Sequence, residues 1–163
     1  MLEQAKRAEN FTPLLLKGMT IPLPAESVDV VYSNQLLEHL HPDDATEHLR
    51  EVHAALRRGG VFVCVTPNRV AGPWDISLYF DENATGFHLK EYTLGELVAM
   101  LKQIGFREVR CHVGAGGWYI RSPRLPVLLL ERCLALLPFS WRFPLARSLP
   151  MRALLGLKVA AVK

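Results

Sequence analysis

The segment that decides the fold reads VDVVYSNQLLEHLHPDDATEHLREVHAALRRGGVFVCV and spans residues 28–65. It opens and closes with nearly continuous apolar runs, Val28–Ser33 and Val61–Val65, which are typical of buried strands covered on both faces. Between these runs, apolar residues recur along one side of a helix at Ala45, Leu49, Val52 and Leu56. A strand, a helix and a strand of these lengths predict a βαβ unit with parallel strands and a right-handed crossover.

The two ends of the central helix carry charge and turn signals. Pro42–Asp44 places a proline and two acids at its start, where free backbone N–H groups favour negative charge. Arg57 and Arg58 complement the other end, and Gly59 predicts a left-handed stop. A separate helical turn is expected over Leu36–Leu40, directly after the first strand.

The rest of the chain extends the same pattern. Thr93-Leu94-Gly95-Glu96 is a capping box, and it opens a helix that Gly105 closes. Further elements are expected as a helix tail and three strands: Leu2–Ala8, then Leu14–Leu16, Phe106–Val113 and Leu157–Val162. Alternating strands and helices predict an α/β fold. We interpret the chain as a single domain, 1–163, with its core at 21–120 and 155–163.

The segment 121–152 differs from the rest because it is both basic and apolar. It holds six arginines and one acid, Glu131, in a chain whose formal net charge is only +3. Apolar residues recur in it at helical spacing, which predicts a helical insertion before the last strand. Three roles are open: a lid over an acceptor site, which we favour, a helix lying on a membrane surface, or a dimer contact. Without lysines or a recognisable motif there, no nucleic-acid partner is expected.

Composition points to a globular chain of 163 residues, half of them hydrophobic. The three cysteines, Cys64, Cys111 and Cys133, are far apart and form no CxxC pair, so the reducing cytoplasm is the expected compartment. The first ten residues show no apolar signal-peptide region. The most apolar run, 125–137, is interrupted by two charges and is shorter than the roughly 20 residues of a membrane span.

Several short motifs follow one another along the chain. They are Ser33-Asn34 at a strand end, the turn Glu38-His39-Leu40, the helix end Leu56–Gly60, then Thr66-Pro67-Asn68 and Gly105-Phe106. In this order and spacing they resemble the class I S-adenosylmethionine (SAM)-dependent methyltransferases of the type 11 kind. The resemblance covers residues 1 to about 113 and the last strand. It implies a Rossmann-like methyltransferase sheet, N-terminally truncated, and transfer of a methyl group from SAM to an acceptor that it does not identify.

The resemblance also implies a strand order of 3-2-1-4-5-7-6, in which Val28–Ser33 is the fourth strand and pairs with Val61–Val65. The first strand of the family, its other neighbour, would lie upstream of Met1. Val28–Ser33 should then have a bare edge with unpaired N–H and C=O groups. We expect the chain to self-associate through this edge, or its own N-terminal segment to cover it.

SAM is the cofactor that the resemblance implies, and the residues it places at the methionine end are Ser33, Asn34, Gln35 and Glu38. An equally open interpretation is a polar strand end with ordinary turn hydrogen bonds. A glycine turn and a ribose-binding acid, which such sheets use to hold the cofactor, have no counterpart here. Gly114–Gly117 follows a late strand and is interpreted as a flexible connection. The 163-residue chain is therefore expected to bind SAM weakly or not at all.

Methyl transfer needs alignment and, for a protonated acceptor, a base. His39 is our first candidate near the transferred methyl group; the alternative is a structural partner of Glu38. The loop Gly72–Tyr92 is the best acceptor-site candidate, because a long loop at the carboxyl end of a strand is usually functional. Its candidate catalytic residues are His88 and Tyr92, and its candidate substrate-binding residues are Trp74, Asp75 and Phe87. The alternative is that the aromatics only anchor the loop. The expected acceptor is a small molecule, a lipid or a glycan.

Two other functions compete with methyl transfer. One is a truncated, non-catalytic relative that acts through partner binding. The other is a zinc-dependent hydrolase, because His39-Leu40-His41-Pro42-Asp43-Asp44 resembles the HxHxDH signature of metallo-β-lactamase-like hydrolases, with Asp44 in place of the last histidine. Further ligands have no obvious counterpart, and Asp43 and Asp44 fit better as charges at a helix N-terminus. No resident metal is expected.

Overall fold

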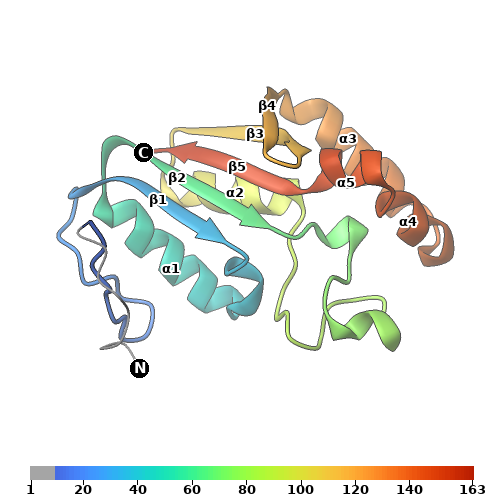
Figure 1. Cartoon of the computed structure of the whole chain (residues 1–163), viewed down its shortest axis with the longest axis horizontal. Helices are drawn as coiled ribbons and strands as arrows, with labels where there is room; N and C mark the ends of the chain where they lie inside the picture. The colour runs from blue at the N-terminus through green and yellow to red at the C-terminus, as the bar shows by residue number, and fades with distance from the viewer. Residues whose placement is uncertain (1–9) are drawn as a thin grey trace.

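The computed structural model describes residues 10–163 and shows a single twisted sheet with its long helices on one side (Figure 1). Its strands are β1 Val28–Asn34, β2 Leu56–Thr66, β3 Glu108–Ala115, β4 Trp118–Ser122 and β5 Leu157–Val162. The strand order is β1-β2-β5-β3-β4. Strands β1 and β2 are parallel, whereas β5 runs antiparallel to both of its neighbours. This order confirms the Rossmann-like methyltransferase sheet that the resemblance implies, with β4 as an added edge strand.

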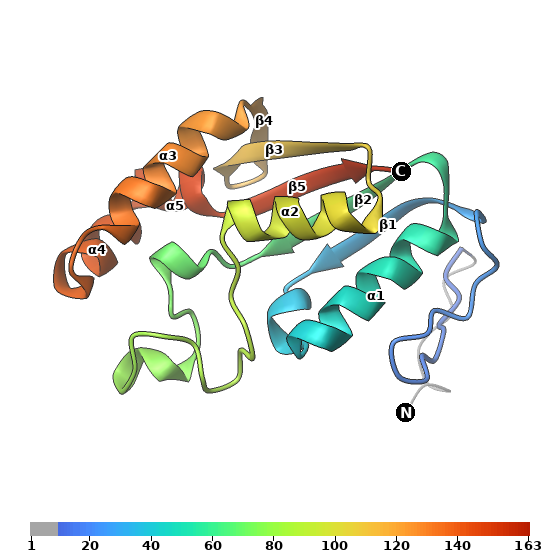
Figure 2. The same cartoon turned by 180° about the vertical axis from the view of Figure 1, so that it is seen from behind.

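Helices α1 (Pro42–Ala55) and α2 (Leu94–Ile104) cover one face of the sheet, as Figure 2 shows. Their apolar sides and the inward side chains of β2 and β5 form the main core. The four residues at helical spacing in α1 and its C-cap, Ala45, Leu49, Val52 and Leu56, are all fully buried. The predicted βαβ unit and the predicted helical stripe are therefore confirmed.

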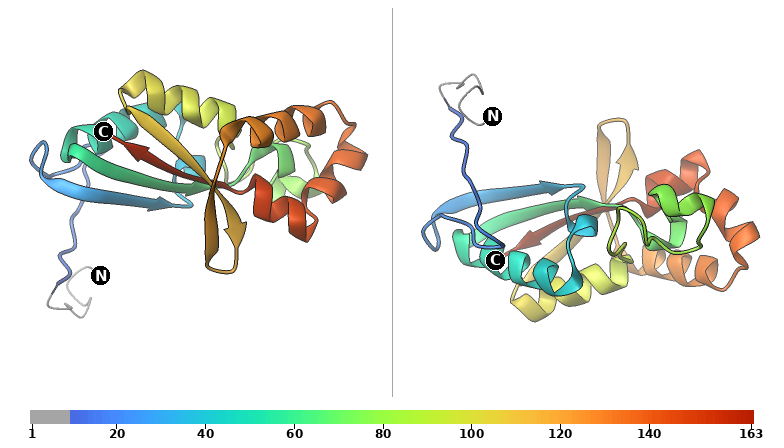
Figure 3. Two further views of the ribbon diagram at one scale, coloured as in Figure 1. Left: turned by 90° about the horizontal axis from the view of Figure 1, so that it is seen from above. Right: turned by 90° about the horizontal axis from the view of Figure 1, so that it is seen from below.

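The opposite face of the sheet is open in the described residues. Val30 and Tyr32 of β1 are 59% and 64% exposed, and no helix of residues 10–163 packs over them. Figure 3 shows the sheet edge-on, with α1 and α2 on one side and the β3–β4 hairpin projecting toward the other. The prediction that Val28–Ser33 is covered on both faces is wrong for this part of the chain. Nor does segment 10–27 pair with β1, which remains the sheet edge.

The C-terminal end of α1 differs from the prediction. The helix stops at Ala55, and Arg57 and Arg58 already belong to β2. Arg57 pairs with Asp29 of the neighbouring strand at 2.5 Å, so its charge links two strands instead of capping a helix. Gly59 does have a left-handed backbone, with φ of 78°, but it lies within β2 near an irregular register with β1.

Of the other local predictions, some are confirmed and one is wrong. The turn at Leu37–His39, the capping box of Thr93 and Glu96, and the strand Leu157–Val162 are confirmed. The strand at Leu14–Leu16 is wrong, because that region forms only an isolated bridge between Lys17 and Thr20. The helix tail predicted at Leu2–Ala8 lies outside the described residues. Of Gly114–Gly117, the first two residues belong to β3, and Gly116 and Gly117 form the tight turn to β4.

The helical insertion before the last strand is confirmed as three helices: α3 Arg124–Ala135, α4 Phe139–Ala146 and α5 Leu149–Leu155. They lie beyond the carboxyl ends of β1 and β2 (Figure 1). A second apolar cluster joins them to the 3₁₀ turn Arg69–Ala71. Helix α3 also reaches the main core, through the apolar Val127 and through Glu131. The Glu131 carboxylate accepts hydrogen bonds from Asn68 Nδ2 at 2.7 Å and from Leu94 N at 2.8 Å. Within residues 10–163 there is no helix with the length and apolar character of a membrane span.

Candidate functional site

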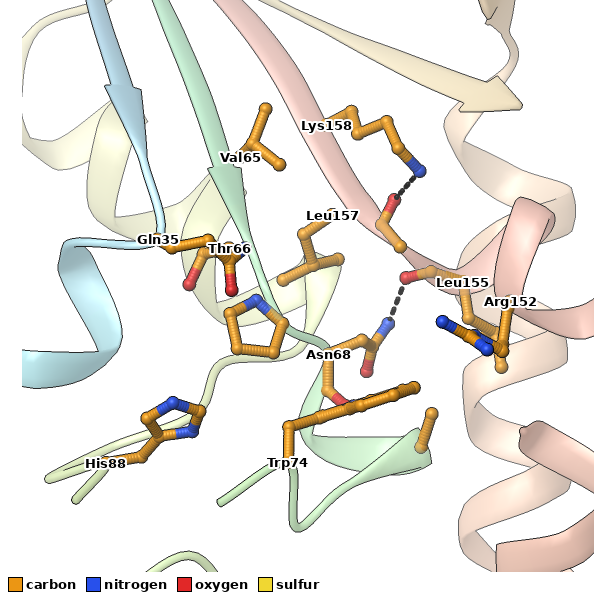
Figure 4. Close-up of a pocket in the computed structure, with 13 residues that line it drawn as sticks. Gln35, Val65, Thr66, Asn68, Trp74, His88, Arg152, Leu155, Leu157 and Lys158 are labelled. Atoms are coloured by element: carbon orange, nitrogen blue, oxygen red, sulfur yellow. Dashed lines mark hydrogen bonds between the residues drawn. The ribbon is translucent and has the colours of Figure 1, made fainter. Parts of the chain in front are cut away.

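A pocket of about 350 Å³ opens where β1 and β2 end and β5 begins (Figure 4). Open α/β sheets bind ligands at the carboxyl ends of their strands, so its position is the expected one. Three predicted site residues line it: Gln35, Trp74 and His88. Figure 4 shows them around the end of β2, with Trp74 and His88 on the loop side and Gln35 beside Thr66. One pocket thus joins predicted cofactor, substrate and catalytic residues.

The turn after β1 places Glu38 under this pocket. Glu38 is fully buried, and its Oε2 accepts a hydrogen bond from Thr66 Oγ1 at 2.8 Å. Its backbone oxygen also accepts bonds from Leu89 N at 2.8 Å and Lys90 N at 3.2 Å. The turn is therefore fixed to the end of β2 and to the long loop, although these segments are far apart in sequence.

The two candidate histidines meet at this turn. The rings of His39 and His88 lie edge to face with centroids 4.9 Å apart. His39 Nδ1 is 3.0 Å from the carbonyl oxygen of Phe87, and His88 Nδ1 is 2.7 Å from Glu91 Oε1. A carbonyl oxygen can only accept, so His39 Nδ1 carries the proton and Nε2 keeps a free lone pair.

The loop 72–92 is held by two carboxylates. The Asp75 carboxylate accepts hydrogen bonds from the backbone N–H groups of Ser77, Gly86 and His88. Burial alone would raise the pKa of Asp75, but the hydrogen bonds from His88, Ser77 and Phe87 outweigh it and lower the pKa to about 2. Glu91 accepts from Trp74 N and lies in contact with His88, and burial raises its pKa. The proposed role of Asp75 in substrate binding thus competes with a structural role that its contacts supply.

The predicted cofactor residues at the end of β1 point to different sides. Ser33 is buried, and its hydroxyl has no hydrogen-bond partner in the described part of the chain. Asn34 lines a hollow of about 630 Å³ on the open face, together with Tyr32 and Tyr119. Gln35 takes a left-handed backbone, with φ of 52°, and lines the pocket at the strand end. Val65 and Lys158 line both cavities, which therefore adjoin.

Two further predicted residues lie apart from the histidines. Tyr92 is fully buried in the main core, and burial raises its pKa to about 12. Its hydroxyl has no hydrogen-bond partner among residues 10–163. A phenol with that pKa stays protonated near neutral pH, so it can donate a proton but cannot act as a base. The Phe87 side chain is 71% exposed, and only its backbone oxygen touches His39.

Sequence analysis missed the cationic side of the pocket. Arg152 and Lys158 line it, and the Arg147 guanidinium lies 4.2 Å from the Trp74 ring centroid. Burial lowers the pKa of Lys158, and burial together with the nearby Arg152 lowers that of Arg147. The excess of arginines in 121–152 was the available signal, but spacing alone could not show that they return to the strand ends.

The side chains of the zinc-hydrolase motif do not come together at one site in the structure. His41 caps α1 through Asp43 N, and the Asp43 side chain is 94% exposed. Among the described residues, a different group of possible metal ligands lies close together: Glu38, His39 and His88, with one ligand atom of each within 4.8 Å of the others. Only one member of the predicted motif belongs to it.

The sheet order is that of the Rossmann-like methyltransferase fold. The structure superposes on a SAM-dependent methyltransferase of Archaeoglobus fulgidus with a TM-score of 0.59, covering 100% of this chain and 72% of that one. At 20% identity this likeness shows the fold alone.

Sequence comparison finds a similarity to methyltransferases over part of the chain. The methyltransferase domain family matches residues 1–64. A probable S-adenosylmethionine-dependent methyltransferase of Mycolicibacterium smegmatis is 40% identical over 86 residues, which are 53% of this chain and 31% of that protein. One of Mycobacterium tuberculosis is 37% identical over 89 residues, 55% of this chain and 30% of that protein. The matched part of the chain is similar to SAM-dependent methyltransferases, and the chain spans about a third of the length of these curated relatives.

The residues at the end of β1 fit the cofactor of this family. Ser33 offers an unpartnered buried hydroxyl, and Gln35 faces the pocket. A methionine moiety carries an ammonium and a carboxylate, which such polar groups can bind. The ribose and adenine have no evident partners among the described residues around this pocket.

Proposed function

We propose that this chain takes part in methyl transfer from SAM to a small-molecule, lipid or glycan acceptor bound in the pocket at the ends of β1 and β2. The observation that carries the proposal is the meeting of Gln35, Trp74 and His88 around one cavity at the sheet end where α/β enzymes bind ligands. Ser33, Asn34, Gln35 and Glu38 are the proposed residues on the cofactor side.

The histidines suit the proton step. SAM supplies, when bound, a methyl group on a sulfonium, and the protein aligns the acceptor and takes its proton. His39 holds its Nδ1 proton against Phe87 and presents a free Nε2 lone pair, as a general base requires. His88 lines the pocket and is steadied by Glu91, so it can orient the acceptor or take the same proton.

The walls of the pocket suggest the character of the acceptor. Trp74 offers an aromatic surface, and Arg152 and Lys158 offer positive charge. These groups favour an acceptor with a flat or apolar part and an anionic group. The insertion carries exposed apolar residues, Leu125, Leu136, Trp141 and Leu149, beside its arginines. This supports a role as a lid that contacts a lipid surface, the peripheral membrane contact that the sequence suggests.

Binding tests the cofactor side of the proposal even where affinity is low. Millimolar SAM added to the ¹⁵N-labelled chain should shift the amide signals of Ser33–Glu38 and His88. Asn34→Ala should weaken these shifts, whereas Asn83→Ala, in the exposed part of the loop, should leave them unchanged. Shifts confined to other regions would overturn the site. Where turnover is measurable with tritiated SAM and an anionic acceptor, His39→Ala should slow it about 10²-fold without unfolding the domain.

A second candidate function is partner binding without catalysis, and the exposed β1 edge favours it. Among residues 10–163, strand β1 pairs only with β2, and Val30 and Tyr32 are exposed beside this edge. A second copy of the chain could add its own β1 there, as edge strands commonly do. Self-association that persists while no SAM-dependent signal shift is seen would favour this function over methyl transfer.

A further inference from the structure

Three side chains with metal-binding atoms meet beside the pocket. One ligand atom from each of Glu38, His39 and His88 lies within 4.8 Å of the others. The two histidines come from segments almost fifty residues apart, and the fold brings their rings into contact. We propose that Glu38, His39 and His88 form a binding site for a divalent transition-metal ion such as Zn²⁺.

The carboxylate of Glu38 gives the first independent support. The side chain is fully buried, Oε2 accepts from Thr66, and Oε1 has no hydrogen-bond partner within residues 10–163. A buried carboxylate oxygen without a donor is costly, so native structures almost always satisfy such an atom. A cation between Glu38 and the two imidazoles would satisfy it, since these are the only clustered ligand groups near it among the described residues.

The histidines are arranged as metal ligands usually are. His39 Nδ1 donates to the Phe87 carbonyl oxygen. As a carboxylate, Glu91 accepts through Oε1 from both Trp74 N and His88 Nδ1, so His88 Nδ1 is the donor in this contact. Both rings therefore hold their proton on Nδ1, and both Nε2 lone pairs are free. A carboxylate or carbonyl behind a ligating histidine fixes its tautomer in this way in known metal sites.

The ligand set selects the class of ion. Two imidazoles and one carboxylate suit Zn²⁺ and neighbouring transition metals, and catalytic zinc sites often use this set with an open position for water or substrate. Mg²⁺ prefers oxygen ligands. Bond lengths of about 2.0–2.2 Å require ligand atoms about 3–3.5 Å apart, so the side chains must close by roughly 1 Å or more. The exposed His39 ring can make this movement.

The inference deepens the proposed function at the same site. The ion would occupy both Nε2 lone pairs, so the histidines would no longer act as bases. Its open position would instead bind an acceptor oxygen and lower the pKa of that group, which then loses its proton to solvent. Metal binding can be measured without SAM, so it can fail while the SAM-dependent amide shifts persist, and the reverse also holds.

Titration of the full 163-residue chain with Co²⁺ and with Zn²⁺ tests the site, in a Cys133→Ser background that removes the exposed thiol. We expect one ion per chain, visible Co²⁺ bands of a four- or five-coordinate site, and displacement of Co²⁺ by Zn²⁺. His39→Ala and Glu38→Gln should each weaken binding at least about 10-fold, and Glu91→Gln should weaken it about 10–100-fold by releasing His88.

The matched control is His41→Ala, which removes a neighbouring exposed histidine of the rival zinc motif and should leave binding unchanged. Far-UV circular dichroism checks that the buried Glu38→Gln variant is folded. If it is not folded, the test rests on the variant at the exposed position, His39→Ala. The proposal is overturned if no stoichiometric ion binds, if His39→Ala binds as the parent does, or if His41→Ala abolishes binding. Displacement of Co²⁺ by millimolar Mg²⁺ would show that the class of ion is wrong.

Discussion

The two faces of the sheet carry similar apolar side chains but differ in what covers them. On the face toward α1 and α2, Phe62, Cys64 and Val159 are essentially inaccessible to solvent. On the other face, Val30 and Tyr32 are largely exposed, and the apolar side chains of β2 between them and β5 are only partly covered. Alternate residues of one strand thus lie in a packed core and on an uncovered apolar surface.

This difference teaches that strand composition and burial are separate properties. A run such as VDVVYS indicates a strand that could be covered on both sides, but only neighbouring elements decide whether it is. An uncovered apolar face beside a free strand edge is the usual mark of an interaction surface or of an aggregation hazard. The comparison of the two faces can be tested at four points.

The largest effect should be on association. We expect the chain to form dimers or larger species through the β1 edge and the adjoining open face, because this association pairs free backbone groups and covers Val30 and Tyr32. Val30→Lys with Tyr32→Lys should shift the population to monomer in sedimentation velocity experiments. Leu136→Lys, at an even more exposed apolar position on the insertion, is the control and should change little.

A stable monomer at about 100 µM, together with fast amide exchange across Val28–Ser33, would contradict this prediction. Protection of the β1 amides in a monomer would instead indicate that another segment of the same chain covers the edge. Segment 10–27 does not do so in the described residues.

The second effect concerns Glu131, whose buried hydrogen bonds join the insertion to the start of α2 and the end of β2. Glu131→Ala removes the acceptor of Asn68 Nδ2 and Leu94 N and leaves two buried donors unpaired. We expect a loss of about 2–4 kcal/mol in the free energy of unfolding, measured by urea denaturation. Glu131→Gln keeps an oxygen acceptor and should lose less.

The sign of the pH dependence follows from the pKa of Glu131, which burial raises although hydrogen bonds from Leu94 and Asn68 oppose the shift. A carboxyl group with a raised folded-state pKa contributes stability below its unfolded pKa, and this contribution is lost as pH rises through the folded value. The parent should therefore lose stability relative to Glu131→Gln over that pH interval. A constant difference across it would contradict the assignment.

A matched pair of substitutions measures the third effect, the energetic contrast between the faces. Val159 on β5 is almost fully buried under the helices, whereas Val63 on β2 lies on the open side and is only partly covered. Val159→Ala should cost about 2 kcal/mol and Val63→Ala less than about 1 kcal/mol in urea denaturation. Equal losses would mean that the open face is covered in solution.

Much of the fold could be predicted because local signals agree with it. Ala45, Leu49 and Val52 fix one side of a helix, and the capping box at Thr93 fixes the start of another. The open face could not be predicted, since periodicity reports which residues are apolar and not what packs on them. Strand β4 was missed because Trp118–Ser122 is short, exposed and stabilised by pairing with β3.

The candidate site shows the same limit. His39 and His88 were chosen for separate reasons, but their contact and the position of Glu38 depend on backbone bonds between the turn and the long loop. Arg152 reaches the pocket because of how the insertion packs, and Lys158 reaches it because β5 pairs with β2, so neither position follows from local sequence. Pairings between distant segments are the part of a structure that local sequence signals do not encode.

The smallest effect should be seen in the reactivity of the cysteines. This reactivity reports how readily the sheet face covered by α1 and α2 opens, and measuring it needs no substitution. Cys64 and Cys111 point into the core, and Cys133 on α3 is exposed. Burial, with a smaller contribution from Glu38, raises the pKa of Cys64 to about 12, and burial also raises the pKa of Cys111. At pH 8 a thiol of pKa about 12 is thiolate in roughly one molecule in 10⁴, and only the thiolate reacts. Iodoacetamide should therefore modify Cys133 within minutes and the two core cysteines only after denaturation, as peptide mass spectrometry can measure. Rapid labelling of Cys64 in the native chain would show that this face opens readily and that the contrast between the two faces is weaker than the structure indicates.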